Sequence, residues 1–166
     1  MTRSNAREIA MHISFETGVN PMPTAELIEL IFEQDYYKSL AQECDVYAER
    51  PSAKQMDYIR RIALGIGEHA AELDSYIEKY SKGWKIGRIS RVAVAVMRLA
   101  MYEIMYMPDI PNGAAINEAV ELAGKYEDKD TVSFINGILG SFVRREMSFE
   151  AENSPAEAAA EEPSEE

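Results

Sequence analysis

The stretch from Val92 to Met107 constrains the fold more than any other part of the chain. Its only charged residues are Arg98 and Glu103. The run is far longer than a typical strand of about 5–6 residues, and it falls short of the roughly 20 apolar residues that a membrane-spanning helix needs. It therefore predicts a helix in the middle of a helical bundle, with the two charges paired or at the rim.

The other periodic segments are also helical, which predicts an all-α fold of about six to seven helices packed as a compact bundle. Apolar residues recur at helical spacing over 3–16, 24–31, 52–80, 111–125 and 131–147, whereas the pattern over 34–49 is blurred. Ser52 and Gln55 are placed as a capping box at the start of the longest segment. Gly65 and Gly67 leave open whether that segment is one long helix or two nearly collinear ones.

The chain of 166 residues is long enough for one domain with a proper core. Its formal net charge is −12, and seven glutamates with no Lys or Arg lie in 150–166. Such a segment buries too little apolar surface to offset its ordering entropy. We therefore expect a helical domain over 1–149 and a disordered acidic tail over 150–166. The acidic balance argues against indiscriminate nucleic-acid binding but permits a local basic patch.

Composition and spacing exclude several classes of protein. Cys44 is the only cysteine, so neither a disulfide framework nor a thiolate metal cluster is expected. The polar N-terminal sequence is unlike a signal peptide, which predicts a soluble, cytoplasmic protein with no membrane association. His12 and His69 do not form the usual metal-binding spacings, and no phosphate-binding loop, serine elbow or dinucleotide fingerprint occurs. We expect no enzyme activity, no cofactor and no metal.

What remains is a binding function. Arg3 and Arg7 are four residues apart, so a helix places both on one flank, where they either meet adjacent phosphates or remain solvated. Phe134 lies about 100° to one side of the apolar stripe of its helix, with Ser141 and Arg145 at a similar azimuth. An aromatic residue there can stack on an unpaired base, or it can pack under a neighbouring helix. Residue type alone favours packing, because large aromatic side chains are mostly buried.

Several strings together resemble the NusB transcription antitermination family. WKIGRISRVAVAVMRLAMYEI resembles its central helix, INEAVELA followed by FINGIL resembles its signature segments, and NAREIAMHISFE resembles its first helix. The resemblance extends from Arg3 to about Val143 and is weakest over 17–57. It implies a non-catalytic helical bundle that binds boxA, a short single-stranded element of nascent ribosomal RNA. NusE, a ribosomal protein of the small subunit, binds with it, and the complex helps to make RNA polymerase resistant to termination.

The resemblance also assigns residues to an RNA site. It places the family's basic N-terminal motif on Arg3 and Arg7 and its helix-one polar and aromatic positions on His12 and Phe15. The base-contacting aromatic falls on Phe134, which reverses the preference for packing, and Ser133 precedes it.

Several departures from the family pattern remove charge. Ser4, Asn5, Gly113 and Ser133 stand where basic residues are common, Phe15 lacks the hydroxyl of a common tyrosine, and Ala93-Val94 replaces a frequent acidic and basic pair. Fewer phosphate partners predict weaker RNA binding with a shallower salt dependence. The change at Ala93-Val94 also puts the NusE contact in doubt.

Alternative functions follow from these departures. The second hypothesis is a protein-only helical adaptor of the same family with little RNA affinity. The third is a detached targeting module, because NusB-like domains also precede RNA cytosine methyltransferases; an unrelated enzyme is the least favoured. The apolar Val92–Met97 run fits either a core or a self-association face, so a homodimer stays open. Arg98 is expected to be structural, held by Glu103 or Glu118.

Overall fold

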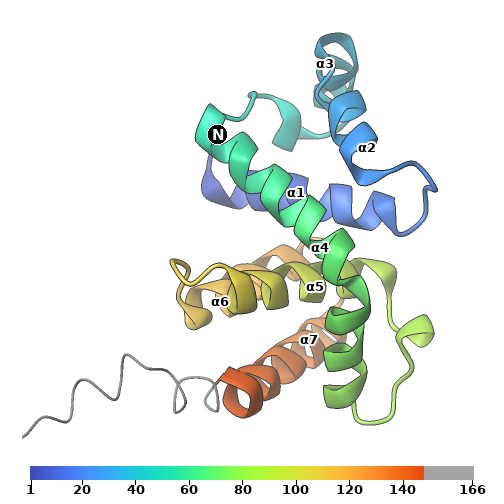
Figure 1. Cartoon of the computed structure of the whole chain (residues 1–166), viewed down its shortest axis with the longest axis vertical. Helices are drawn as coiled ribbons and strands as arrows, with labels where there is room; N and C mark the ends of the chain where they lie inside the picture. Colours follow the sequence, from blue (N-terminus) through green and yellow to red (C-terminus); the bar gives the residue numbers. More distant parts are fainter. Residues whose placement is uncertain (148–166) are drawn as a thin grey trace, which may run out of the picture.

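The computed structural model describes residues 1–147, and in that part of the chain every regular element is helical (Figure 1). The all-α prediction is therefore confirmed. The predicted tail, 150–166, lies outside the described residues. Short 3-10 helices occur at Asp45–Tyr47 and Ile86–Arg88, and a π-helical turn, Val143–Met147, follows the last helix. The α-helices are α1 (Arg3–Thr17), α2 (Thr24–Ile31), α3 (Gln34–Glu43), α4 (Ala53–Tyr80), α5 (Arg91–Tyr106), α6 (Asn112–Gly124) and α7 (Lys129–Phe142).

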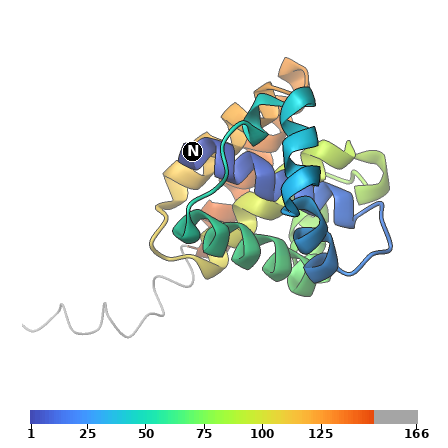
Figure 2. The ribbon, with the colours of Figure 1, turned by 90° about the horizontal axis from the view of Figure 1, so that it is seen from above.

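Helix α4 connects the two halves of the molecule. In Figure 1, α1 to α3 lie at one end and α5 to α7 at the other, and α4 runs along both. It packs against α1 and α2 as well as against α5 and α7. The view from above shows the link between α3 and α4 crossing over α1 (Figure 2). Helix α4 and the direct packing of α1 on α5 thus fix the relative position of the two ends.

Helix α4 is one unbroken helix of 28 residues. Its start is the predicted capping box: the backbone N–H of Gln55 donates to the Ser52 hydroxyl (3.2 Å), and the N–H of Ser52 donates to the Gln55 side chain (3.0 Å). Gly65 lies inside the helix where α4 meets α5, and a Cβ atom there would fall 2.2 Å from the ring of Tyr102. The glycine is therefore needed for close packing, and it does not break the helix.

Helix α5 forms the centre of the core, as its sequence predicts. Residues 93–97 and 99–104 are all buried within the single chain. Most of the Val92–Met97 run is therefore buried in the core. Its apolar character is explained by this burial, and the run presents no exposed apolar face that would need a second copy of the chain to cover it. Among the described residues, no helix is both long and apolar enough to cross a membrane.

The expected partner of Arg98 is wrong. Its guanidinium donates two hydrogen bonds of 2.7 Å to the carboxylate of Asp74 on α4, not to Glu103 or Glu118. Glu103 is five residues from Arg98 along α5, so the two side chains lie on different faces of the helix. Side chains on one helix meet when they are three or four residues apart. Arg98 therefore joins α5 to α4, which is the structural role expected of it.

Candidate nucleic-acid interface

Arg3 and Arg7 both line one groove at the start of α1, in line with the prediction that they project from one flank, but they differ in burial. Arg3 is exposed, whereas Arg7 is only 5 % exposed. The guanidinium of Arg7 donates to both carboxylate oxygens of Glu103 (2.9 and 2.8 Å), and its third nitrogen lies 3.3 Å from Glu118. Burial disfavours the charge on Arg7, but the hydrogen bonds to Glu103 and the attraction of the surrounding acidic groups together outweigh it and raise the pKa of Arg7. Arg7 thus joins α1 to α5 and α6.

His12 lies in a hydrogen-bonded network between α1 and neighbouring tyrosines. Its Nε2 lies 2.7 Å from the hydroxyl of Tyr126, which donates to Glu8 (2.5 Å), and its Nδ1 lies 2.8 Å from the hydroxyl of Tyr47. Since the single Tyr126 proton goes to Glu8, we assign the imidazole proton to Nε2 and let Tyr47 donate to Nδ1. Burial lowers the pKa of His12 and favours this neutral form. Both ring nitrogens therefore have partners inside the protein.

Glu8 anchors this network although it is buried. Burial opposes its ionisation, but hydrogen bonds from Lys125 (2.8 Å) and Tyr126 outweigh that effect and hold the pKa of Glu8 below its usual value. The network ties α1 to the end of α6 and to the segment after it. His12 accordingly faces a different side of α1 from the exposed Arg3.

Phe15 borders a depression between the end of α1 and the start of α5. Its half-buried ring lies beside Arg91 and Ile89, which line the same depression. The Ser14 hydroxyl is also buried there, and it has no hydrogen-bond partner among the described residues. Phe15 thus lies near the loop that enters α5, at the end of α1 opposite Arg3.

Ser133 and Phe134 lie on α7 beside the same loop. Ser133 is exposed and Phe134 half-buried, with its ring 6.3 Å from that of Trp84 at an angle of 66°. Trp84 is 54 % exposed, more than any other exposed large apolar side chain of the described chain. Sequence reasoning did not assign a role to Trp84, although a lone tryptophan among lysines and arginines was visible in the string that begins with it.

The depressions at Phe15 and Phe134 adjoin. Ile89 lines both of them, so they lie on either side of this residue. We call the area bordered by Phe15, Ile89, Trp84 and Phe134 the aromatic surface. The structure thus brings Phe15, Ser133 and Phe134 to one region and leaves Arg3 at the other end of α1, about 18 Å away at 1.5 Å per residue.

Comparison with known proteins identifies the family. The sequence profile of the NusB family matches residues 4–144. The chain belongs to the NusB family. The transcription antitermination protein NusB of Clostridium botulinum strain Kyoto is 37% identical over 143 residues, which cover 86% of this chain and 100% of that protein. The protein of the same name from Thermoanaerobacter sp. strain X514 is 34% identical over 154 residues, covering 93% and 99%.

Solved NusB structures have the same fold. T. maritima NusB superposes with a TM-score of 0.71 at 27% identity, covering 87% of this chain and 92% of that chain. A crystal structure of the antitermination factors NusB and NusE in complex with dsRNA contains a chain that superposes with a TM-score of 0.67 at 22% identity, covering 86% and 96%. The second likeness concerns the fold alone.

The two signature strings, INEAVELA and FINGIL, combine core positions with exposed ones. In INEAVELA, Ala119, Leu122 and Ala123 are buried. In FINGIL, the residues that follow Phe134 divide between the two sides of α7: 135, 138 and 139 are buried, and 136 and 137 are exposed. The signature therefore combines residues that pack α6 and α7 against α5 with the exposed residues 136 and 137 near Phe134.

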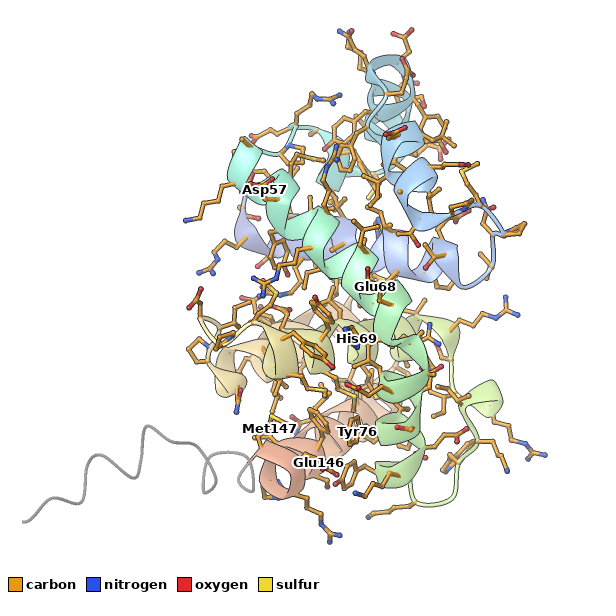
Figure 3. All side chains as sticks on the ribbon, viewed as in Figure 1. Asp57, Glu68, His69, Tyr76, Glu146 and Met147 are labelled. Carbon is orange, nitrogen blue, oxygen red and sulfur yellow. The ribbon has the colours of Figure 1, made fainter. Side chains whose placement is uncertain are left out.

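The other histidine belongs to the packing of α4 on α5. His69, labelled in Figure 3, stacks on the ring of Tyr106 with centroids 4.3 Å apart, and its Nδ1 lies 3.2 Å from the Tyr106 hydroxyl. That hydroxyl donates to Glu72 (2.6 Å), and this hydrogen bond raises the pKa of Tyr106 to about 12. Over residues 1–147 no cluster of three or more His, Cys, Asp or Glu side chains is placed to hold a metal ion.

Proposed function

We propose that this protein is a transcription antitermination factor that binds boxA-type single-stranded RNA together with NusE, within an RNA polymerase antitermination complex. The membership of the NusB family supports this function, because curated relatives at 37% identity are named transcription antitermination proteins. A solved NusB and NusE complex with dsRNA supports the two kinds of partner. The role involves no catalysis and would place the protein in the cytoplasm.

The observation that carries the proposal is the position of Phe134. Its ring is neither in the core nor fully free: it is half-buried, at the edge of a depression and next to an exposed tryptophan. Aromatic rings held in this way are the usual platforms on which proteins stack unpaired bases. In our proposal Phe134 stacks a base, and Ser133 and Phe15 border the strand.

The basic residues of α1 take different roles in this proposal. Arg3 is exposed and available to a phosphate, whereas Arg7 and His12 already have internal partners. We therefore assign phosphate contact to Arg3. Arg7 and His12, which the resemblance assigned to RNA, act by holding α1 against α5 and α6.

Fluorescence anisotropy of a labelled boxA-like RNA tests the function, with and without NusE and at low and physiological salt. We expect binding that NusE tightens and that salt weakens, because phosphate contacts release counterions. Absence of RNA binding even in the presence of NusE would contradict the proposal.

The buried pairing of Arg7 favours one alternative, the protein-only adaptor. It removes from the surface a cation that the family resemblance assigned to phosphate binding. An adaptor would bind NusE while leaving RNA unbound. The same titration with labelled NusE in place of labelled RNA detects this outcome.

A further inference from the structure

The segment that joins α4 to α5 is a concentrated patch of positive charge. Residues 82–91, which we call the basic loop, contain Lys82, Lys85, Arg88 and Arg91 and no acidic residue, in a chain with a net charge of −12. All four side chains are exposed. None of them forms an ion pair with another residue of the described chain. The charge of the loop is therefore not used to hold the fold together.

The backbone of the basic loop is nevertheless held in place. The buried hydroxyl of Ser81 donates to the carbonyl of Trp84 (2.7 Å), and the N–H of Ile86 donates to the carboxylate of Glu78 on α4 (3.2 Å). The N–H of Arg88 donates to the carbonyl of Lys85 (2.9 Å) and closes a 3-10 turn. A fixed backbone with outward side chains loses less conformational entropy when it binds a ligand.

Trp84 and Phe134 offer two stacking platforms that are not parallel. Their ring planes make an angle of 66° with centroids 6.3 Å apart, and Trp84 is 54 % exposed. Bases that stack on the two rings must therefore be turned away from each other, which a duplex does not permit. A strand with unpaired, splayed bases fits this geometry.

We infer that single-stranded RNA lies across the basic loop and α7, with one base stacked on Trp84, another on Phe134, and phosphates contacted by Lys85 and Arg88. This inference rests on the proposed function and adds residues that the family resemblance did not assign. Arg88, Trp84 and Phe134 line one depression, so the cation lies beside both rings. Asp130 also lines it, so phosphates are expected on the side of the loop rather than on α7. Unpaired cations beside exposed rings match phosphates and bases, which favours RNA over a protein partner.

Intrinsic fluorescence tests the inference directly, because Trp84 is the only tryptophan of the chain. A boxA-like RNA is added to the full-length protein, and the Trp84→Phe protein supplies the blank. We expect the single strand to quench Trp84, and a hairpin that pairs the same sequence to require at least about tenfold more RNA for the same effect, since stacking needs unpaired bases. The anisotropy of labelled RNA is followed in parallel and reports binding anywhere on the protein.

Matched variants separate stacking from charge. Trp84→Ala should weaken RNA binding about tenfold. Lys85→Gln with Arg88→Gln should lower the slope of log affinity against log salt by about 1.4, at about 0.7 for each phosphate contact. Lys38→Gln with Arg60→Gln changes the net charge equally, at exposed positions on α3 and the first half of α4, and should leave the slope nearly unchanged.

The outcomes distinguish the inference from the proposed function. If RNA binds by anisotropy but Trp84 is not quenched and the two double variants behave alike, the inference is wrong and the proposed function stands. If no RNA binds with or without NusE, the proposed function fails, and the inference fails with it. If NusE without RNA changes the Trp84 signal and RNA does not, the loop is a protein interface, which also overturns the inference.

Discussion

At the junction of α1 with α5, Arg7 lies over the ring of Tyr58, and at the aromatic surface Arg88 lies beside the ring of Trp84, yet the two regions use their arginines differently. At the junction, Arg7 is 5 % exposed and Glu103 is fully buried, and they pair with each other. At the surface, Arg88 and Trp84 are exposed, and the cation has no acidic partner in the described chain. Residue type alone therefore does not say whether an arginine serves the fold or a ligand; burial and pairing do.

The largest expected effect comes from breaking the pair at the junction. Arg7→Ala leaves the carboxylate of Glu103 buried without its main partner, and removal of one member of a buried pair costs about 3–5 kcal/mol. We expect the free energy of unfolding in urea to fall by that amount. Arg3→Ala, on the exposed side of the same helix, should change it by no more than about 0.5 kcal/mol. Equal free energies of unfolding for the two variants would contradict the claim that Arg7 stabilises the fold and Arg3 does not.

A smaller loss should follow from one added methyl group at the interface of α4 with α5. Gly65→Ala places Cβ 2.2 Å from the ring of Tyr102, and overpacking of this kind costs about 1–3 kcal/mol. Gly67→Ala is the control, because its Cβ would meet only the Thr24 hydroxyl at 3.5 Å on an exposed face. It should stabilise the protein by up to about 1 kcal/mol through helix propensity. Thermal unfolding of both proteins measures the difference; a stabilised Gly65→Ala protein would show that the interface is loose.

At the aromatic surface, the effect should appear in binding rather than in folding. Phe134→Ala is expected to weaken the binding of boxA-like RNA about tenfold, as removal of one stacked aromatic typically does. Because the ring is half-buried, some stability is lost as well, but far less than the roughly 3–5 kcal/mol expected for Phe142→Ala in the core. Anisotropy and urea unfolding are measured on the same samples. A Phe134→Ala protein that loses stability but binds RNA normally would assign Phe134 to the core.

The smallest expected effect concerns the network around His12. Burial lowers the pKa of His12 in the folded state, so below about 6.5 the unfolded chain binds more protons at this residue and the fold loses stability as the pH falls. Glu8, whose folded pKa is also lowered, adds a further loss at more acidic pH, as the pH falls through its folded pKa. The His12→Gln variant should therefore lose less stability than the unmodified protein between pH 7 and pH 5. Identical pH profiles would mean that His12 is not held neutral.

Most of the fold was predictable because each helix carries a local signal. The apolar run of α5 is enough to predict a central helix, and the capping box at Ser52 is enough to predict the start of a long one. Neither prediction needs the contacts that these helices make. Helix α3 was not recognised, and the structure gives the reason: only Tyr37 of its residues is buried, so no apolar stripe marks it. The sequence alone also leaves open whether Gly65 interrupts α4, because the close approach of Tyr102 depends on a helix distant in sequence.

The candidate site was harder to predict, because pairing across the chain decides which residues are available. Arg7 and Glu103 are 96 residues apart, and nothing local shows that they meet. The sequence shows only that the charge of Glu103, within the apolar α5, needs some partner. Trp84 and the basic loop were visible as residue types, but their exposure and the approach of Phe134 are properties of the folded chain.

Cross-linking tests most directly whether RNA lies on the aromatic surface. A boxA-like RNA that carries 4-thiouridine is irradiated in complex with the full-length protein and NusE, and mass spectrometry locates the linked peptides. We predict cross-links to the peptides that contain Trp84 and Phe134. RNA bound in the same complex but linked only to peptides that contain neither Trp84 nor Phe134, such as those of α3, would contradict the assignment.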